Sequence, residues 1–358
     1  MTTYFYCDKI YPDLAFHDYI SLAEGFTELG ISCFGDREMY KQGVNKDFLI
    51  KYDKDFHIES ADIVFFHYTL YSLKEKQADD IIKKLINIPN RKFITIFIDS
   101  ADGLITSGYN KGAQLCDIVL KTHYNEKYAY PSNFHAWQFG LTNRILNAVD
   151  PIPYNERKDR FLVNFRQKHQ LRDYVNNLIH PIIDKHSHWD CAFDNFTAEG
   201  LDDDDLLFWN QTGARHYPSY YKKLSVTKSC ACYGGVFAMP WGNTNKYTAK
   251  IARKINDIIK VSKWDRVRQW DSWRLWEAWA AGCCVVHIDF DKYGCKLPVM
   301  PENGVHYIGI DIDNLTRFEK QIGEDMEFIA QKGREFVLEH YSPLQVAKRL
   351  LKLLNIEK

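Results

Sequence analysis

Short apolar runs alternate with amphipathic stretches through the first half of the chain, and this pattern predicts an α/β sheet. Two stretches carry apolar residues at helical spacing, one from Tyr19 to Leu29 and one over residues 74–88. Around them lie five runs rich in β-branched and aromatic residues: TYFYC, ISCFGD, ADIVFFHY, RKFITIFIDSADG and CDIVLKTHY. Strands that alternate with helices favour a doubly wound parallel sheet with helices on both faces.

Polar side chains follow several of these predicted strands. Functional loops of doubly wound sheets lie at the carboxyl ends of the strands, so one rim should hold Asp8, His17, His67, Asp99 and Asp102. His17, Asp99 and Asp102 are our candidates for a general base. Each also has a structural interpretation, because a histidine can pair near a helix start and the aspartates of DSADG form turns readily.

A segment without periodicity, AVDPIPYNERKD, separates the first half from the second. Its two prolines and many charges are typical of a linker. We therefore expect one Rossmann-like domain over residues 1–150 and a second over residues 151–340. A last helix, within residues 341–358, should begin with Ser342 as N-cap and Pro343 as first helical residue, and we expect it to pack back on the first domain.

The stretch from Gln269 to Phe290 predicts one helix followed by one buried strand. Asp271 or Ser272 can cap the helix, and CCVVHI is typical of a strand covered on both faces. The helix is almost entirely apolar, yet it carries Arg274 and Glu277 one turn apart. Two interpretations are open: the charges pair with each other, or Arg274 and the N–H groups of the helix start bind an anion.

A basic turn follows RFLVNF, the first predicted strand of the second half. It contains Arg166, Lys168, His169 and Arg172. A strand that runs into a basic turn and a helix can cradle a phosphate, and a solvated, charged helix start is an equal alternative.

Composition and charge narrow the class of protein. The chain has 358 residues, of which 46% are hydrophobic and 26% charged, as in an ordinary globular protein of about two domains. The formal net charge is −1, so we expect neither nucleic acid nor an anionic membrane as a partner. Neighbouring carboxylates repel, so the run Asp202–Asp205 should be a solvated acidic loop rather than a metal site.

The cysteines and the apolar runs indicate a cellular compartment. None of the nine cysteines forms a CxxC pair, which suits small core residues in a reducing environment. We see no signal peptide, and no apolar run approaches a transmembrane span. We therefore expect a cytoplasmic protein.

The order of motifs in the second half resembles the C-terminal half of GT-B glycosyltransferases. The resemblance is carried by YYKKLSVTKSCACYGG, DSWRLWEAWAAGCCVVHIDF, ENGVHYIGI and GREFVLEHYSPLQVAKRLL. It looks closest to the exostosin-like and spore-maturation (CgeB-like) groups, in which a D/S-x-R-x-x-EA-x-x-x-G helix precedes a strand. The resemblance covers roughly residues 160–355, and the first half agrees in architecture only.

The resemblance implies two Rossmann-like, doubly wound domains that face each other across a cleft. The donor, a nucleotide sugar such as a UDP- or GDP-sugar, would lie on the C-terminal domain and the acceptor on the N-terminal domain. Glu277 would accept hydrogen bonds from the donor ribose, and the helix start with its cations would hold the diphosphate. The residues implied for the donor are Arg166, Lys168, Asp271, Ser272, Arg274 and Glu277. A helix N-terminus and cations can stabilise a leaving phosphate, so we expect neither a metal ion nor a cofactor.

We therefore expect a glycosyltransferase that moves a sugar from a nucleoside diphosphate to a hydroxyl of a glycan or another acceptor. Retaining members of the resembled group commonly carry a second glutamate before the EA motif, where this chain has Gln269, so the stereochemistry stays open. Two alternatives remain. One is a nucleotide-sugar epimerase or hydrolase of the same fold, and the other is a catalytically degenerate nucleotide-sugar-binding partner.

Overall fold

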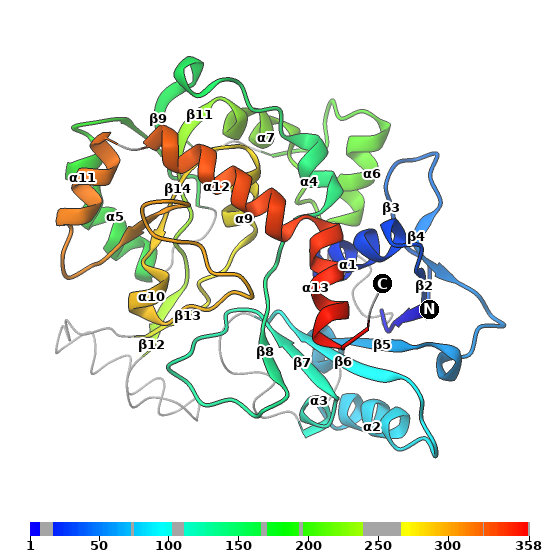
Figure 1. Cartoon of the computed structure of the whole chain (residues 1–358). Coiled ribbons are helices and arrows are strands. Elements are labelled where there is room, and N and C mark those ends of the chain that lie inside the picture. The colour runs from blue at the N-terminus through cyan, green and yellow to red at the C-terminus, as the bar shows by residue number, and fades with distance from the viewer. Residues whose placement is uncertain are drawn as a thin grey trace.

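Two parallel sheets form the framework of the chain in the computed structural model (Figure 1). The structure describes residues 1–7, 17–72, 75–101, 111–165, 170–192, 196–238, 266–324 and 326–356. The first sheet has eight strands in the order β3-β4-β2-β1-β5-β6-β7-β8, and the second has five in the order β10-β9-β11-β14-β15. A two-stranded antiparallel ribbon, β12–β13, accompanies the second sheet.

The first sheet is parallel throughout except at β3, which pairs with β4 in the antiparallel sense. Its strands are β1 (Thr2–Phe5), β2 (Ser32–Gly35), β3 (Met39–Lys41), β4 (Phe48–Tyr52), β5 (Ile63–His67), β6 (Ile94–Asp99), β7 (Ile118–Lys121) and β8 (Phe134–Ala136). Its helices are α1 (His17–Glu28), α2 (Glu75–Ile86) and α3 (Lys111–Gln114), with the short 3-10 turns η1 (Ile58–Ser60) and η2 (Tyr68–Ser72).

All neighbours in the second sheet are parallel. The strands are β9 (Lys158–Leu162), β10 (His188–Asp190), β11 (Thr227–Ala231), β14 (Cys284–Ile288) and β15 (Ile308–Ile310), with β12 (Val236–Ala238) and β13 (Arg266–Arg268) in the ribbon. The helical segments are α4 (Asn143–Ala148), η3 (Tyr154–Glu156), α5 (Gln170–Ile183), α6 (Asp203–Gln211), α7 (Pro218–Ser225), α9 (Trp273–Ala280), α10 (Phe290–Tyr293), α11 (Thr316–Glu324), α12 (Met326–Tyr341) and α13 (Pro343–Leu353).

The predicted doubly wound α/β class is confirmed, and the five strands expected in the first half are β1, β2, β5, β6 and β7. Three further strands, β3, β4 and β8, were not expected. Each has three to five residues, and β4 ends in exposed residues, so none offers a run of apolar positions long enough to stand out.

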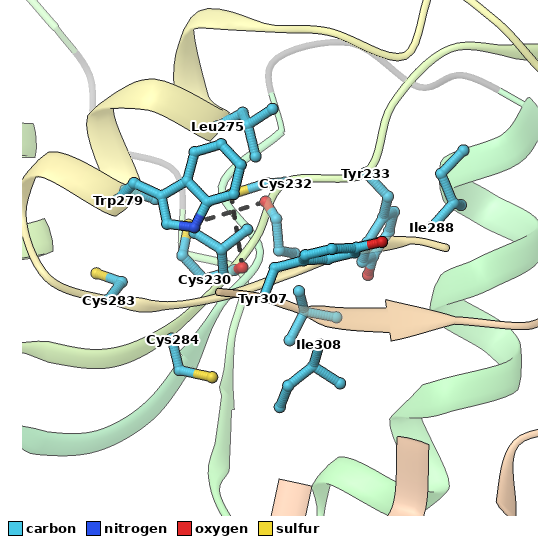
Figure 2. Packing of buried hydrophobic residues seen from close by; sticks show 14 of the residues in the cluster. Cys230, Cys232, Tyr233, Leu275, Trp279, Cys283, Cys284, Ile288, Tyr307 and Ile308 are labelled. Atoms are coloured by element: carbon cyan, nitrogen blue, oxygen red, sulfur yellow. Dashed lines mark hydrogen bonds between the residues drawn. The ribbon is translucent and has the colours of Figure 1, made fainter. Parts of the chain in front are cut away.

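The core of the second sheet is built around α9 and β14. All five residues of β14 are buried, as a strand covered on both faces requires. In Figure 2, Leu275 and Trp279 of α9 pack against Cys230 and Cys232 near the end of β11. The indole N–H of Trp279 still finds a partner, because it donates to the carbonyl of His306 at 2.7 Å. The predicted helix and buried strand are therefore both confirmed.

The last helix, α13, lies against α1 (Figure 1). Ser342 is its N-cap and Pro343 its first residue, as the sequence predicts. Its apolar face, formed by Val346, Ala347, Leu350 and Leu351, joins the cluster that contains Phe5 and Tyr19 of the first sheet's core.

In its described part the chain passes between the two cores more than once, and Phe208 of α6 also packs against the first core. Leu141 and Ile145 already belong to the core of the second sheet, ahead of the prolines at 151 and 153. The chain returns to the first core in α13. The domain limits at residues 150 and 340 stay a prediction.

The acidic run Asp202–Asp205 is not the loop that we expected. Asp202 is the N-cap of α6, and its carboxylate accepts a hydrogen bond from the N–H of Asp205 at 2.8 Å. The three aspartates that follow occupy the first turn, where the positive end of the helix dipole offsets their mutual repulsion. Four aspartates in a row are therefore a helix start here.

Candidate nucleotide-sugar site

The start of α9 lies where the carboxyl ends of the parallel strands β9, β11 and β14 meet. Ser272 is the N-cap residue, with extended backbone dihedrals, but its side chain makes no capping hydrogen bond. Its hydroxyl oxygen is buried and has no hydrogen-bond partner among the described residues. Three residues before this N-cap, Gln269 takes a left-handed backbone with φ of 50°. Such strain in a non-glycine residue concentrates at functional sites.

Arg274 is the charged group of this helix start. Its guanidinium donates from Nη2 to the carbonyl of Asn164, which follows β9, and lies 4.7 Å over the ring of Phe165. Its Nε has no partner in the described part of the chain, and neither do the side-chain nitrogen and oxygen of Asn164, all of them buried. Buried polar groups are normally hydrogen-bonded, so Ser272, Asn164 and Arg274 together have unused capacity for a polar ligand.

A second guanidinium lies on the same ring. Arg172 of α5 is 4.3 Å from the ring centre of Phe165, and its Nε donates to the carbonyl of Tyr233 at 3.4 Å. Gly234 leaves room for it, because a Cβ there would lie 3.0 Å from Nη2 of Arg172. Two cations thus reach the carboxyl edge of the second sheet, which suits an anionic ligand. The predicted phosphate contacts Arg166 and Lys168 lie outside the described residues.

Glu277 lies one turn further along α9 and is buried, with 7% of its surface exposed. Its Oε1 accepts a hydrogen bond from the hydroxyl of Tyr221 on α7 at 3.0 Å. Both charges of the apolar helix therefore bond to other elements, Arg274 to the loop after β9 and Glu277 to α7.

Asp271 differs from Ser272 and Arg274 because its carboxylate oxygens already have hydrogen-bond partners within the protein. One carboxylate oxygen accepts from the indole of Trp276 at 2.7 Å and the other from the N–H of Phe139 at 2.9 Å. Its own N–H donates to Nδ1 of His123 at 3.0 Å. Burial raises the pKa of Asp271 to about 7. These contacts tie the loop after β8 to α9, so they fit a structural role better than contact with a diphosphate.

His17 forms a contact between α1, which packs on the first sheet, and the start of α9. It is the first residue of α1, and its ring stacks on Trp273, with ring centroids 4.2 Å apart and planes inclined by 28°. Its Nε2 is buried without a hydrogen-bond partner in the described part of the chain. Burial, with Arg144 and Arg215 acting in the same direction, lowers the pKa of His17 to about 3. The imidazole is therefore neutral, and its low basicity makes it a better hydrogen-bonding group than a general base.

Asp99, another candidate base, has a different environment from His17. Asp99 is fully buried and bonds to Nζ of Lys121 at 2.8 Å. This buried ion pair at the ends of β6 and β7 gives Asp99 a structural role. Asp102 lies outside the described residues, as does Asp8.

Two polar clusters at the site were missed as clusters by sequence reasoning. In one, Asp18 of α1 bonds to Nε2 of His67 at 3.2 Å, and that nitrogen also lies 2.9 Å from the hydroxyl of Ser100. Burial would raise the pKa of Asp18, but His67 and Ser100 hold it below its ordinary value. In the other, Arg144 of α4 reaches Tyr221. The only signal available was the placement of His67 on the rim, because the partners are far apart in sequence.

Two absences concern only the described residues. No group of three or more histidine, cysteine, aspartate or glutamate side chains there could hold a metal ion. No helix in the described ranges combines the length and apolar character needed to cross a membrane.

All nine cysteines are free thiols, and all but Cys191 are buried.

The fold has solved relatives. No protein-family model matches the chain, and no curated protein sequence does. An α-glucosyltransferase in complex with UDP and a 13-mer DNA with a central A:G mismatch is 10% identical, with a TM-score of 0.53 over 99% of this chain and 98% of that chain. An α-glucosyltransferase with UDP and a 13-mer DNA containing an HMU base is 11% identical, with a TM-score of 0.52 over 99% of each chain.

These likenesses show the fold, which is the two-sheet α/β architecture of GT-B glycosyltransferases. They also correct one expectation. We excluded nucleic acid from a net charge of −1, yet both of these structures hold DNA on the same fold. The exclusion was wrong, because net charge averages over the surface and says nothing about a local basic patch.

Proposed function

We propose that the protein is a glycosyltransferase that moves a sugar from a nucleoside diphosphate to an acceptor hydroxyl. The donor would lie on residues 151–340 and the acceptor on residues 1–150. The DSWRLWEAWAAG motif also supports exostosin-like and CgeB-like glycosyltransferases as the nearest groups. The two similar solved structures that hold UDP support the proposal at the level of fold.

One observation carries the proposal: the buried guanidinium of Arg274 at the start of α9, beside polar atoms of Ser272 and Asn164 that have no partner among the described residues. An anion at this position would meet a positive charge, the N–H groups of a helix N-terminus and spare hydrogen-bonding groups. In sugar transfer the same contacts would stabilise the charge that develops on the leaving diphosphate, without a metal ion. Glu277, buried one turn away, would accept from the ribose hydroxyls.

The test is calorimetric binding of UDP and GDP to the wild-type protein and to Arg274→Ala, Glu277→Gln and Lys332→Ala. Lys332 is a matched control, because its charge lies on the surface of α12 and pairs with Glu335. We expect Arg274→Ala to weaken binding at least tenfold, since a hydrogen bond to a charged group contributes about 1.5–3 kcal/mol. Lys332→Ala should bind like the wild type. Equal binding by wild type and Arg274→Ala would contradict the assignment.

Turnover distinguishes the proposed transferase from the two alternatives. A transferase consumes UDP-sugar faster when a suitable acceptor is added. An epimerase or hydrolase turns over the donor without any acceptor, and a degenerate binding partner binds the nucleotide without turnover of any donor sugar.

A hydroxyl-bearing nucleic acid is a second candidate acceptor. The segment 243–270 contains eight lysines and arginines and two aspartates, a local basic run inside a nearly neutral chain. The two similar structures in complex with DNA add to this candidate. The comparison to make is transfer of labelled sugar to duplex DNA with hydroxymethylated bases, to the same duplex without them, and to a panel of oligosaccharides.

A further inference from the structure

A chain of buried hydrogen bonds runs from Glu277 away from the proposed ligand. The hydroxyl of Tyr221 donates to Glu277 at 3.0 Å and accepts from Nη1 of Arg144 at 2.8 Å. The same Nη1 lies 3.0 Å from Nδ1 of His216, and Nε2 of His216 lies 2.7 Å from a carboxylate oxygen of Asp205. The chain thus connects carboxylates on α9 and α6 through a guanidinium on α4.

The direction of every hydrogen bond in this chain follows from Arg144. A guanidinium can only donate, so the Tyr221 oxygen must accept from it and turn its own proton toward Glu277. Likewise Nδ1 of His216 must accept, which places the ring proton on Nε2, facing Asp205. Arg144 therefore fixes the orientation of both neighbours, and the Tyr221 hydroxyl has one available orientation.

Burial makes this arrangement stiff. Arg144 is 4% exposed, His216 2% and Tyr221 0%. The charge of Arg144 acts on Glu277 as well as on Tyr221, and Nη2 has no hydrogen-bond partner among the described residues. A buried cation is costly without nearby acceptors, so the hydrogen bonds of Nη1 to Tyr221 and His216 hold Arg144 in this position.

We propose that Tyr221 and Arg144 are positioning residues that hold the Glu277 carboxylate oriented for the ribose of a nucleoside diphosphate. The inference rests on the proposed function, because it presumes that Glu277 meets the ribose. Tyr221 donates to Oε1 and so restrains the carboxylate. Neither Tyr221 nor Arg144 needs to touch the ligand, and both act through Glu277.

The helix that carries Arg144, α4, is also hydrogen-bonded to α1 of the first sheet. The N–H of Asn143, the residue before it, donates to Glu24 of α1 at 2.8 Å, and Glu24 also accepts from Gln42 at 3.0 Å. Arg144, whose guanidinium orients Glu277, therefore belongs to a short helix, α4, that a hydrogen bond to α1 holds in place. Its position depends on the contact between the two sheets, and so does the proposed ribose contact.

The test compares a ribonucleotide with its deoxyribonucleotide. Binding of UDP and 2′-deoxy-UDP is measured by calorimetry for wild type, Tyr221→Phe, Glu277→Gln, the double variant, and Tyr307→Phe as control. Tyr307 is also a fully buried tyrosine of the second core, and its hydroxyl accepts from the N–H of Phe290. Arg144→Lys is added, with pyrophosphate as a probe that has no ribose.

We expect the wild type to bind UDP more tightly than 2′-deoxy-UDP. In Tyr221→Phe the ratio of these two affinities should fall about tenfold, as loss of a hydrogen bond to a charged group implies. Tyr221→Phe should add nothing to Glu277→Gln, because residues that act through one group are not additive. Pyrophosphate affinity and the behaviour of Tyr307→Phe should match the wild type. Arg144→Lys should lose the preference as well.

Five results overturn the inference. If Tyr221→Phe keeps the preference, or if its effect adds to that of Glu277→Gln, the positioning role is wrong while the donor site stands. If Tyr221→Phe weakens pyrophosphate equally, its effect is general damage to the fold. If the wild type binds UDP without preference for the ribonucleotide, or Glu277→Gln keeps that preference, the ribose contact of the proposed function fails and the inference fails with it.

Discussion

The imidazole of His17 stacks on the indole of Trp273 at a centroid distance of 4.2 Å. This contact places the first residue of α1, from the first sheet, against the first residue of α9, from the second. It therefore joins a rim residue of one sheet to the proposed diphosphate site of the other. The two sheets meet at the residues that would bind the donor.

The stack should be measurable as a coupling energy. In a double-mutant cycle of His17→Ala and Trp273→Ala, we expect the two losses in the free energy of unfolding to differ from additivity by about 1 kcal/mol. Urea unfolding of the four proteins gives this value. Strict additivity would mean that the two rings stabilise the protein independently.

Protonation of His17 should destabilise the fold. Its pKa is about 3 in the folded chain and near 6.5 when unfolded, so the unfolded state binds more protons between these values. The stabilising contribution of the neutral ring is complete above pH 6.5 and is lost as the pH falls toward 3, at about 1.4 kcal/mol per pH unit.

His17→Gln removes this dependence. Between about pH 6.5 and about pH 4.5, its free energy of unfolding should gain about 2 kcal/mol relative to that of the wild type. Glu24 and Asp271, whose pKa values burial raises to about 7, change stability in the opposite direction in both proteins, so the comparison isolates His17. Parallel pH profiles for the two proteins would contradict the prediction.

The ion pair between Asp99 and Lys121 should be structural. Asp99→Asn leaves a buried ammonium without its carboxylate, and we expect a loss of about 3–5 kcal/mol in urea unfolding. Pairing this change with Lys121→Met should recover most of the loss, because the buried charge is then gone. A stable Asp99→Asn single variant that lacks transferase activity would instead return Asp99 to the mechanism.

Gly25 allows α13 to approach α1. A Cβ at this position would overlap the carbonyl oxygen of Pro343 and lie 2.7 Å from the Cβ of Ala347. We expect Gly25→Ala to cost about 3 kcal/mol or more, the upper end for overpacking.

Gly30 provides the control for this substitution. It has a φ of 70°, and a Cβ added to it would meet nothing within 4 Å among the described residues, so Gly30→Ala should cost only about 1 kcal/mol, from backbone strain. Thermal unfolding of the two variants makes the comparison. Similar melting temperatures would show that α13 can shift without loss.

Local pattern was sufficient to predict several elements, both at the site and away from it. The apolar run of β14, the capped start of α13 and the helix that carries Arg274 were all predicted from residues adjacent in sequence. The same reasoning failed at Asp202, because a run of aspartates supports two predictions. Repulsion between the charges favours a loop, whereas capping favours a helix start. Only the residues packed around it decide between the two.

Side-chain roles depended on contacts that no local pattern contains. Asp271 was placed among the donor-binding residues, yet its partner Phe139 lies 132 residues away. Arg144 lies ahead of the linker and was not among the candidate site residues, and its connection to Glu277 exists only once α4, α7 and α9 are packed together. A sequence shows which residues carry charge, and the tertiary structure decides which of those charges are already used.

The docking of α13 on α1 has a consequence for synthesis of the protein. Chains emerge from the ribosome N-terminus first, and domains generally fold in that order. Here the core around Phe5 and Tyr19 takes Val346 and Leu350 from α13, so it stays incomplete until residue 350 has been made. The core of the first sheet can therefore be completed only after the residues of the second sheet have been synthesised. A ribosome-bound chain stalled before residue 343 should expose the apolar face of α1 to chaperones.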